Sequence, residues 1–231
     1  MAELDGPRLP PASGKAAKQL VVFLHGYGAN GQDLIGLGAQ WQNLLPEAAF
    51  VSPNAPETLP MAGFGGYQWF ELTMRDPDER WRGVNKAAPL LNAFLDEELA
   101  ALGLDDSALS LVGFSQGTMM ALHVGLRRGK SLKAIVGYSG MIAGAEHLDG
   151  KHLDAEQIHK VPVLLVHGTA DDVIPIQAMQ MTREVLGARG FCVEWHESAG
   201  IGHGIDGDGL MLGGQFLRSA FDGKLKCDEK R

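Results

Sequence analysis

The sequence is poor in cysteine, in long apolar runs and in basic clusters, and each shortage argues against a class of protein. Only two cysteines occur, Cys192 and Cys227, which fits a reducing compartment without a disulfide framework. No run approaches the roughly 18 to 20 apolar residues of a membrane-spanning helix. Residues 1–18 contain three prolines and no apolar core of signal-peptide length. We therefore expect a flexible lead-in and a cytoplasmic protein.

Acidic residues outnumber basic ones. The chain has 20 Lys and Arg residues against 28 Asp and Glu residues, which gives a formal net charge of -8 at pH 7. No block of Lys and Arg forms a positive stripe, and this argues against nucleic acid and anionic membranes as partners. The sequence carries no indication of the oligomeric state.

The chain does contain enough apolar sequence for one substantial core. With 231 residues, 45% of them hydrophobic, we expect one domain over residues 19–221, followed by a charged tail over 222–231. Buried-strand patterns alternate with helical periodicity, which predicts an α/β fold with a mostly parallel central sheet and helices on both faces. The expected strands are 19–24, 48–51, 109–112, 132–138, 161–168 and 191–196, and the expected helices are 33–45, 85–102, about 116–129, 176–188 and 208–221.

Residues 56–83 are the least regular part of the sequence, because glycines and prolines are mixed there with aromatic residues. A connection of this length inside a compact domain usually has a function. The aromatic side chains either anchor a surface segment to the core, or form a wall or lid over an apolar substrate groove. The second interpretation makes Phe64, Trp69 and Phe70 candidate substrate-binding residues.

A run of apolar residues ends in Gly113-Phe114-Ser115-Gln116-Gly117, after which apolar residues return at helical spacing. This pattern predicts a strand, a tight turn and a helix, with a serine at the apex of the turn. A serine in that place has a strained backbone, and the residues two before and two after it need almost no side chain. Ser115 is therefore the candidate nucleophile.

A serine hydroxyl needs a base to take its proton and an acid to orient the base. In one class of serine hydrolases the acid and then the histidine follow the serine, in loops after strands. His203, between two glycines beyond the last expected strand, is the candidate base, whereas the pattern around His196 places that residue in or at the end of the strand. Asp171 and Asp172 are adjacent candidates for the acid. The pattern does not separate them: one would orient the base and the other would cap the next helix.

The charge that develops on a carbonyl oxygen under attack needs backbone donors. One candidate is the N–H of Gln116, which follows Ser115 at the start of a helix. The other is the N–H of Tyr27, in the glycine-rich segment 25–28 after the first buried strand. Both segments leave the carboxyl ends of strands, where ligands of open α/β sheets bind.

Taken together, the segments resemble the phospholipase/carboxylesterase family of α/β-hydrolases, which includes acyl-protein thioesterases and small bacterial carboxylesterases. The resemblance implies the α/β-hydrolase fold, with Ser115 as nucleophile, His203 as base and Asp171 as acid in preference to Asp172. The matching segments, in the order of the family, are Phe23-Leu24-His25-Gly26-Tyr27-Gly28, Pro53-Asn54-Ala55-Pro56, Trp69-Phe70, Gly113-Phe114-Ser115-Gln116-Gly117, His167-Gly168-Thr169-Ala170-Asp171-Asp172-Val173-Ile174-Pro175 and Gly202-His203.

The resemblance further implies a serine hydrolase that cleaves carboxylic esters through an acyl-enzyme, without a metal or a cofactor. Its oxyanion donors would be the backbone N–H groups of Tyr27 and Gln116. Small-molecule esters, thioesters and other acylated substrates such as lysophospholipids are the candidate substrates. One departure from the family pattern is Thr118, where a second glycine is usual. We expect altered packing there, with catalysis retained.

Two other functions compete with this interpretation. A serine peptidase or acyl transferase on the same fold would differ from an esterase in its preferred leaving group. A non-catalytic binding protein on the same fold would lack a member of the triad, and here Ser115, Asp171 and His203 are all present.

Overall fold

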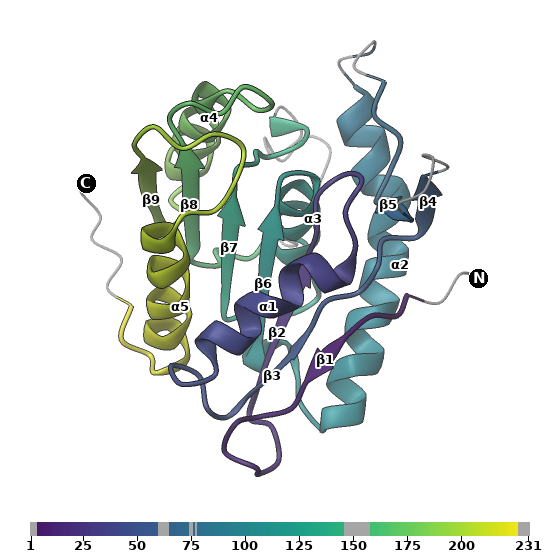
Figure 1. The fold of residues 1–231 in the computed structure, drawn as a ribbon, viewed down its shortest axis with the longest axis vertical. Helices are drawn as coiled ribbons and strands as arrows, with labels where there is room; N and C mark the ends of the chain where they lie inside the picture. The colour runs from purple at the N-terminus through teal and green to yellow at the C-terminus, as the bar shows by residue number, and fades with distance from the viewer. Residues whose placement is uncertain (1–3, 60–64, 74–75, 77, 146–157, 226–231) are drawn as a thin grey trace.

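The computed structural model describes residues 4–59, 65–73, 76, 78–145 and 158–225, which fold around one central sheet (Figure 1). Within these residues the sheet has seven strands in the order β1-β3-β2-β6-β7-β8-β9. Neighbouring strands are parallel except at one edge, where β1 is antiparallel to β3. The predicted mostly parallel sheet is confirmed. The strands are β1 (Arg8–Leu9), β2 (Gln19–Leu24), β3 (Ala48–Val51), β6 (Leu109–Phe114), β7 (Ala134–Tyr138), β8 (Val163–Gly168) and β9 (Val193–Ser198).

Helices cover both faces of the sheet, as its continuous apolar strands require. They are α1 (Gly31–Trp41), α2 (Glu79–Leu102), α3 (Gln116–Gly125), α4 (Ile176–Gly187) and α5 (Gly207–Phe221). Figure 1 shows α1 and α5 in front of the sheet. Side chains of β2 alternate accordingly, because Val21 and Phe23 join the core cluster of α1 and α5, while Val22 joins that of α2, α3 and α4. Among the helices of the described residues, none combines the length and the apolarity that crossing a membrane requires.

Part of the N-terminal lead-in is ordered, in contrast to the flexible segment that the sequence predicts. β1 pairs with β3 at the edge of the sheet, and Leu4 is buried. The guanidinium of Arg8 also lies 2.6 Å from the carboxylate of Glu98 in α2. A strand of two residues has no hydrophobic periodicity, so the sequence pattern could not reveal it.

Helix α2 begins at Glu79, well before the predicted start at residue 85. Its additional turns contain Gly83, and glycine is a weak helix former. The ring of Phe70 packs so closely on this glycine that a Cβ there would lie 2.3 Å from a ring carbon. Packing outweighs helix propensity at this end. As a consequence Pro89 lies in the interior of the helix, and not near its start as the sequence suggests.

The irregular segment 56–83 contains a short antiparallel pair of strands, β4 (Glu57–Leu59) and β5 (Gly66–Gln68). Tyr67 in β5 also pairs with the loop that follows β2. It accepts a hydrogen bond from Gly28 N–H at 2.9 Å and donates one to the carbonyl of Ala29 at 2.8 Å. The segment is therefore tied to the loop that carries Tyr27.

Cys192 is disulfide-bonded, whereas the sequence predicts a chain without disulfides. The sequence contains one other cysteine, Cys227, which lies outside the described residues. The small number of cysteines is therefore a weak indication of a reducing compartment.

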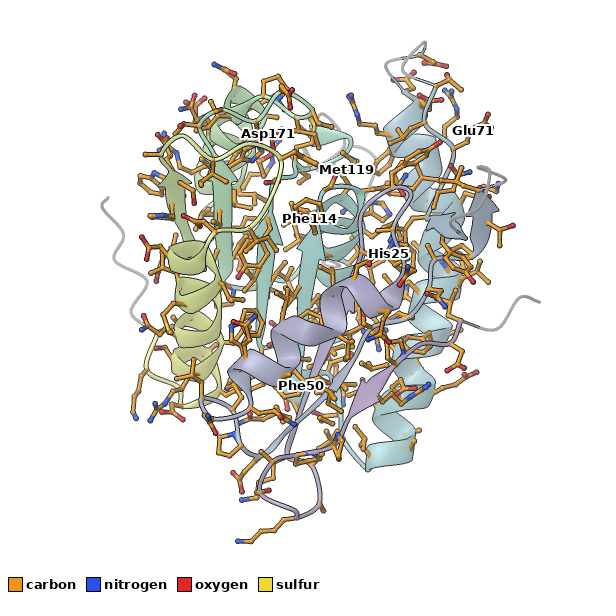
Figure 2. The ribbon with its side chains drawn as sticks, viewed as in Figure 1. His25, Phe50, Glu71, Phe114, Met119 and Asp171 are labelled. Carbon is orange, nitrogen blue, oxygen red and sulfur yellow. The ribbon has the colours of Figure 1, made fainter. Side chains whose placement is uncertain are left out.

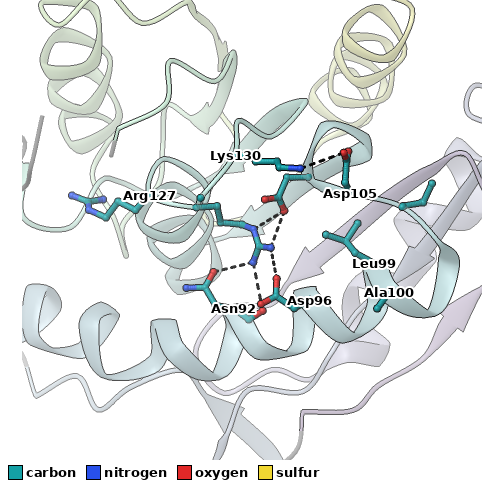
Figure 3. A pocket seen from close by; sticks show the side chains of 11 residues that line it. Asn92, Asp96, Leu99, Ala100, Asp105, Arg127 and Lys130 are labelled. Atoms are coloured by element: carbon teal, nitrogen blue, oxygen red, sulfur yellow. Dashed lines mark hydrogen bonds and ion pairs between the residues drawn. The ribbon is translucent and has the colours of Figure 1, made fainter. Parts of the chain in front are cut away.

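Arg128 forms a cluster of ion pairs and hydrogen bonds with residues of α2 and of the segment before β6, at the amino end of that strand and not at the carboxyl end that carries the serine turn. Figure 3 draws interactions of this cluster as dashed lines. Arg128 is only 8% exposed. Its guanidinium donates to Asp106 at 2.8 Å, to the side chain of Asn92 at 3.0 Å and to the carboxylate of Asp96. These bonds tie α2 to the segments that flank β6 and α3.

We expect Arg128→Met to lower the free energy of unfolding by about 3 kcal/mol, because it leaves the buried carboxylate of Asp106 without its partner. Lys130→Met is the matched control. Lys130 is exposed and its ammonium lies 3.8 Å from Asp105, so its loss should cost less than about 1 kcal/mol. Urea unfolding followed by circular dichroism measures both values. Equal stability of the two variants would contradict the structural role of the cluster.

Candidate active site

The backbone of Ser115 has a conformation that residues other than glycine rarely adopt. Ser115 stands between β6 and α3 with φ 54° and ψ -115°. Its N–H donates to the carbonyl of Tyr138, the last residue of β7, at 2.9 Å. Strain of this kind persists where the surrounding structure enforces it, and it is concentrated at functional sites. The strand, turn and helix that the motif predicts are present.

The two glycines of the motif lie where the turn is closest to its neighbours. A Cβ on Gly117 would lie 1.8 Å from the carbonyl oxygen of Leu24 in β2, and a Cβ on Gly113 would lie 2.4 Å from the carbonyl oxygen of Gly117. Backbone atoms cannot move aside as a flexible side chain would. Glycine at both positions is what allows β2, β6 and α3 to meet at Ser115.

Thr118, the departure from the family pattern, is accommodated by the neighbouring strand. Its side chain is buried, and its hydroxyl oxygen lies 2.9 Å from each of the carbonyl oxygens of Gly113 and Tyr138. A Cβ on Gly137 or on Gly140 would lie 2.6 Å or 2.4 Å from a carbon atom of Thr118. The altered packing therefore consists of Thr118 packed against Gly137 in β7 and Gly140 just after it.

Asp171 and His203 lie on the loops that follow β8 and β9, where their side chains are in contact. Nδ1 of His203 donates a hydrogen bond of 2.8 Å to Oδ2 of Asp171. The imidazole also packs against the ring of Phe114, with 4.9 Å between the ring centroids, and Phe114 immediately precedes Ser115. Figure 2 shows Asp171 and Phe114 toward the same end of the sheet. The predicted acid and base are thus together, beside the turn that carries Ser115.

The carboxylate of Asp171 is fully buried and accepts hydrogen bonds on both oxygens. Oδ1 accepts from the N–H groups of Val173 and Ile174 at 2.9 and 2.8 Å, and Oδ2 accepts from His203. Burial alone would raise the pKa of Asp171, but the hydrogen bonds from His203 and from the two backbone N–H groups outweigh it and lower the pKa below its ordinary value. Asp171 is therefore an anion at neutral pH.

The neighbouring carboxylate does not have the role that the sequence suggests. Asp172 is exposed, and it does not cap the following helix. The N-cap residue of α4 is Pro175, which has no side-chain capping bond. The prediction that the second carboxylate caps this helix is wrong, because the bonds to the loop N–H groups come from Asp171 itself. His196 lies within β9, as its alternation pattern predicts.

The two predicted oxyanion donors carry unused N–H groups. Neither Tyr27 N–H nor Gln116 N–H has an acceptor within the described part of the chain, and the first N–H groups of a helix have none inside the helix. The loop after β2 touches the serine turn directly, since a Cβ on Gly26 would lie 3.3 Å from Cβ of Ser115. Both donors therefore belong to the immediate surroundings of Ser115.

The side chain of Gln116 has a role that sequence reasoning missed. It is fully buried; its carbonyl oxygen accepts from Trp69 N–H at 2.9 Å, and its amide donates to the carbonyl of Phe70 at 2.8 Å. The side-chain amide of the residue after Ser115 thus bonds the backbone of Trp69 and Phe70 much as a neighbouring strand would. The pattern along the chain contains no signal for these bonds, because their partners are backbone groups more than 40 residues away.

His25 joins the same segment to the loop after β2. Its Nε2 accepts a hydrogen bond of 2.9 Å from Ala55 N–H, and its Nδ1 lies 2.8 Å from the carbonyl of Gly26. These partners require the proton on Nδ1, and burial lowers the pKa of His25, which favours that neutral form. The indole N–H of Trp69 donates to the backbone carbonyl of His25 at 3.0 Å.

The three candidate substrate-binding residues have different outcomes. Trp69 and Phe70 are each 1% exposed and belong to the core between the sheet and α2. Their burial favours the interpretation in which they anchor the segment 56–83, so a substrate-binding role for them stays a prediction without support. Phe64 lies outside the described residues.

A hydroxyl, an imidazole and a carboxylate lie at this end of the sheet, with the imidazole and the carboxylate in contact and two backbone N–H donors beside the serine turn. Acyl transfer to serine uses this set of groups. Among the described residues, no group of three or more His, Cys, Asp and Glu side chains is arranged to hold a metal ion.

Comparison with known proteins gives consistent matches over most of the chain. A family model described as phospholipase/carboxylesterase matches residues 11–220. Acyl-protein thioesterase 1 of Schizosaccharomyces pombe is 32% identical over 67% of this chain and 69% of that protein. Esterase YpfH of Escherichia coli is 28% identical over 88% of this chain and 84% of that protein. The crystal structure of esterase PE8 matches with a TM-score of 0.87 and 45% identity, over 94% of this chain and 99% of that one.

We expect Gln116→Met to lower the free energy of unfolding by about 3 kcal/mol, because the buried N–H of Trp69 and the carbonyl of Phe70 both lose their partner. Gln32→Met, on an exposed position of α1, is the control and should change stability by less than about 0.5 kcal/mol. Thermal and urea unfolding of the purified variants test this. Indistinguishable stabilities would show that the segment is not held by Gln116.

Proposed function

The chain belongs to the phospholipase/carboxylesterase family, and on that premise we propose that Ser115, His203 and Asp171 are the catalytic triad with which it works. Relatives named as esterases and as acyl-protein thioesterases make it a hydrolase of carboxylic esters or thioesters. The observation that carries the proposed triad is the 2.8 Å hydrogen bond between His203 and Asp171, beside a serine with positive φ.

In the proposed mechanism the bond to Asp171 keeps the proton of the neutral His203 ring on Nδ1, which leaves the lone pair on Nε2 for the hydroxyl of Ser115. Ser115 Oγ attacks the carbonyl carbon of the ester while Nε2 takes the hydroxyl proton. The imidazolium then gives this proton to the leaving alcohol or thiol as the tetrahedral intermediate collapses to an acyl-serine. Water then attacks the carbonyl carbon of the acyl-serine while Nε2 takes its proton. The bond from Ser115 Oγ to the acyl carbon breaks, Nε2 returns the proton to Oγ, and the acid is released.

We assign the oxyanion of the tetrahedral intermediate to the N–H groups of Tyr27 and Gln116. Both are free of acceptors in the described part of the chain, and both flank Ser115. The N–H of Gln116 is also at the amino end of α3, where the helix dipole favours negative charge. Donors that are in place before the reaction stabilise the developing charge without further reorganisation.

For the acyl group we propose an apolar contact surface at the rim of the site. Tyr27 and Val173 are large side chains that are left 45% and 60% exposed. Tyr27 is on the oxyanion loop, and Val173 follows Asp171 by two residues. Exposed apolar side chains on both loops support an ester, thioester or lysophospholipid with an apolar acyl chain. A peptidase or acyl transferase would use the same triad and differ in the leaving group that it accepts.

The cytoplasmic location that the composition predicts is kept as a proposal. The disulfide of Cys192 is an observation against it, because disulfides are rare in reducing compartments.

We expect Ser115→Ala and Asp171→Asn to leave the fold intact and to remove most of the esterase activity. Ser115→Ala deletes the nucleophile, and kcat for a short-chain nitrophenyl ester should fall to background. Asp171→Asn keeps the volume but loses the charge and favours the wrong tautomer of His203, so kcat should fall by about 10³- to 10⁴-fold. The same acyl group on an alcohol, a thiol and an amine identifies the class of leaving group.

Asp172→Asn is the matched control for the acid, because Asp172 is the adjacent carboxylate and is exposed. Its kcat should equal that of the wild-type protein. Retained turnover in folded Ser115→Ala, or equal losses at the two aspartates, would refute the proposed triad.

A further inference from the structure

We propose that His167 is a positioning residue that holds the carboxylate of Asp171 in the orientation that His203 requires. The inference rests on the proposed triad and adds a second imidazole to it. His167 is the penultimate residue of β8, four residues before Asp171. Its Nε2 lies 2.7 Å from the carbonyl oxygen of Ile174 and 3.2 Å from Oδ2 of Asp171.

The surroundings of His167 determine where its proton lies. Both neighbours of Nε2 are acceptors, a carbonyl oxygen and a carboxylate oxygen, so Nε2 must carry hydrogen. Nδ1 is buried and has no hydrogen-bond partner among the described residues, so it does not need the proton. The ring is therefore the Nε2–H tautomer. Its hydrogen bond goes to the carbonyl of Ile174, and Oδ2 of Asp171 lies 3.2 Å from the same nitrogen.

With His167 included, the Asp171 carboxylate is surrounded by donors. Oδ1 accepts from two backbone N–H groups of its own loop, Oδ2 accepts from His203 Nδ1, and the N–H of His167 Nε2 lies 3.2 Å from Oδ2. A rotation of the carboxylate that weakens one of these bonds weakens the others. His167, a residue of β8, thus helps to fix the direction in which Oδ2 presents its lone pair to His203.

His167 also closes the acid loop onto the strand from which it leaves. Its bond to Ile174 spans the loop, and Ala170 N–H donates to the carbonyl of Ile201 at 2.9 Å, in the loop of His203. The adjacent Gly168 is equally close to that loop, since a Cβ there would lie 2.2 Å from the carbonyl oxygen of Ile201. The end of β8 therefore sets the separation of the acid and the base.

His167 is not itself a candidate base. Its side chain is 0% exposed, whereas that of His203 is 19% exposed, and the nitrogen that forms a hydrogen bond within the described residues faces the acid loop. It touches neither the reacting atoms nor solvent. Any effect of His167 on turnover must therefore act through the orientation of Asp171. The experiment has to measure that orientation as well as activity.

The test uses three variants that differ in where a donor is placed. His167→Gln can present an amide N–H where Nε2 stands, His167→Asn presents the same group where Nδ1 stands, and His167→Leu has no donor at similar volume. We expect kcat for a nitrophenyl ester to fall by up to about 100-fold in the Leu and Asn variants, with KM within about twofold, and to recover to within about fivefold of wild type in the Gln variant.

A second readout does not depend on turnover. The proton of the bond between His203 Nδ1 and Asp171 resonates far downfield of the amide protons in the ¹H NMR spectrum. Removal of the N–H group that lies 3.2 Å from Oδ2 should move this resonance in the Leu and Asn variants and leave it near its wild-type position in the Gln variant. Thermal unfolding identifies the variants that are folded. If the Leu variant is unfolded, the comparison of the Asn and Gln variants tests the positioning role by itself.

The outcomes separate the two proposals. Folded Leu and Asn variants with wild-type kcat and an unmoved resonance, or a Gln variant no better than Asn, would overturn the positioning role. Failure of the proposed function appears differently, as a wild-type protein without ester turnover. In that case the resonance still decides whether His167 positions Asp171.

Discussion

The site depends on one close approach of backbone, where the start of α3 meets the end of β2. Gly117 leaves no room for a side chain against the carbonyl of Leu24, and Gly113 leaves none against the turn. This contact forces the chain into the sharp turn that gives Ser115 its positive φ. It also brings the loop after β2 to the side of the serine, and the Tyr27 N–H of that loop has no acceptor in the described part of the chain.

Around that contact the structure adds a second layer of buried hydrogen bonds. Gln116, directly after the serine, bonds the backbone of Trp69 and Phe70, and the indole of Trp69 bonds the carbonyl of His25. The segment 56–83 therefore supports the serine turn and the oxyanion loop from outside. At the other side of the site, the end of β8 supports the loop of Asp171 through the hydrogen bond between His167 and Ile174. Both supports use groups that lie in or against the sheet and are consequently rigid.

The sequence was most informative where the structure depends on local pattern. β2 and β3 have the predicted bounds, because continuous apolar runs between turn residues identify buried strands. The serine turn follows from two glycines at a fixed spacing, and the order of the acid and the histidine follows from the alternation of strands and loops. The roles of these residues remain proposals, but the structure has Asp171 and His203 in contact.

The features that could not be predicted depend on distant partners. The early start of α2 comes from the packing of Phe70 on Gly83, and the role of the Gln116 amide comes from backbone groups of another segment. The sequence predicts that one of the two adjacent aspartates caps the next helix, yet in the described structure the bonds to the loop N–H groups come from Asp171, the same residue that contacts His203. Neither hydrophobic period nor motif spacing contains such contacts.

The central claim is that Ser115 is a nucleophile activated by His203. Reaction with a fluorophosphonate, followed by peptide mass spectrometry, tests it most directly, since the probe is captured by an activated serine and models the tetrahedral intermediate. The account predicts one phosphonyl group per chain, on Ser115, and strongly slowed capture in His203→Ala. Labelling at another residue, or equal capture by the two proteins, would contradict it.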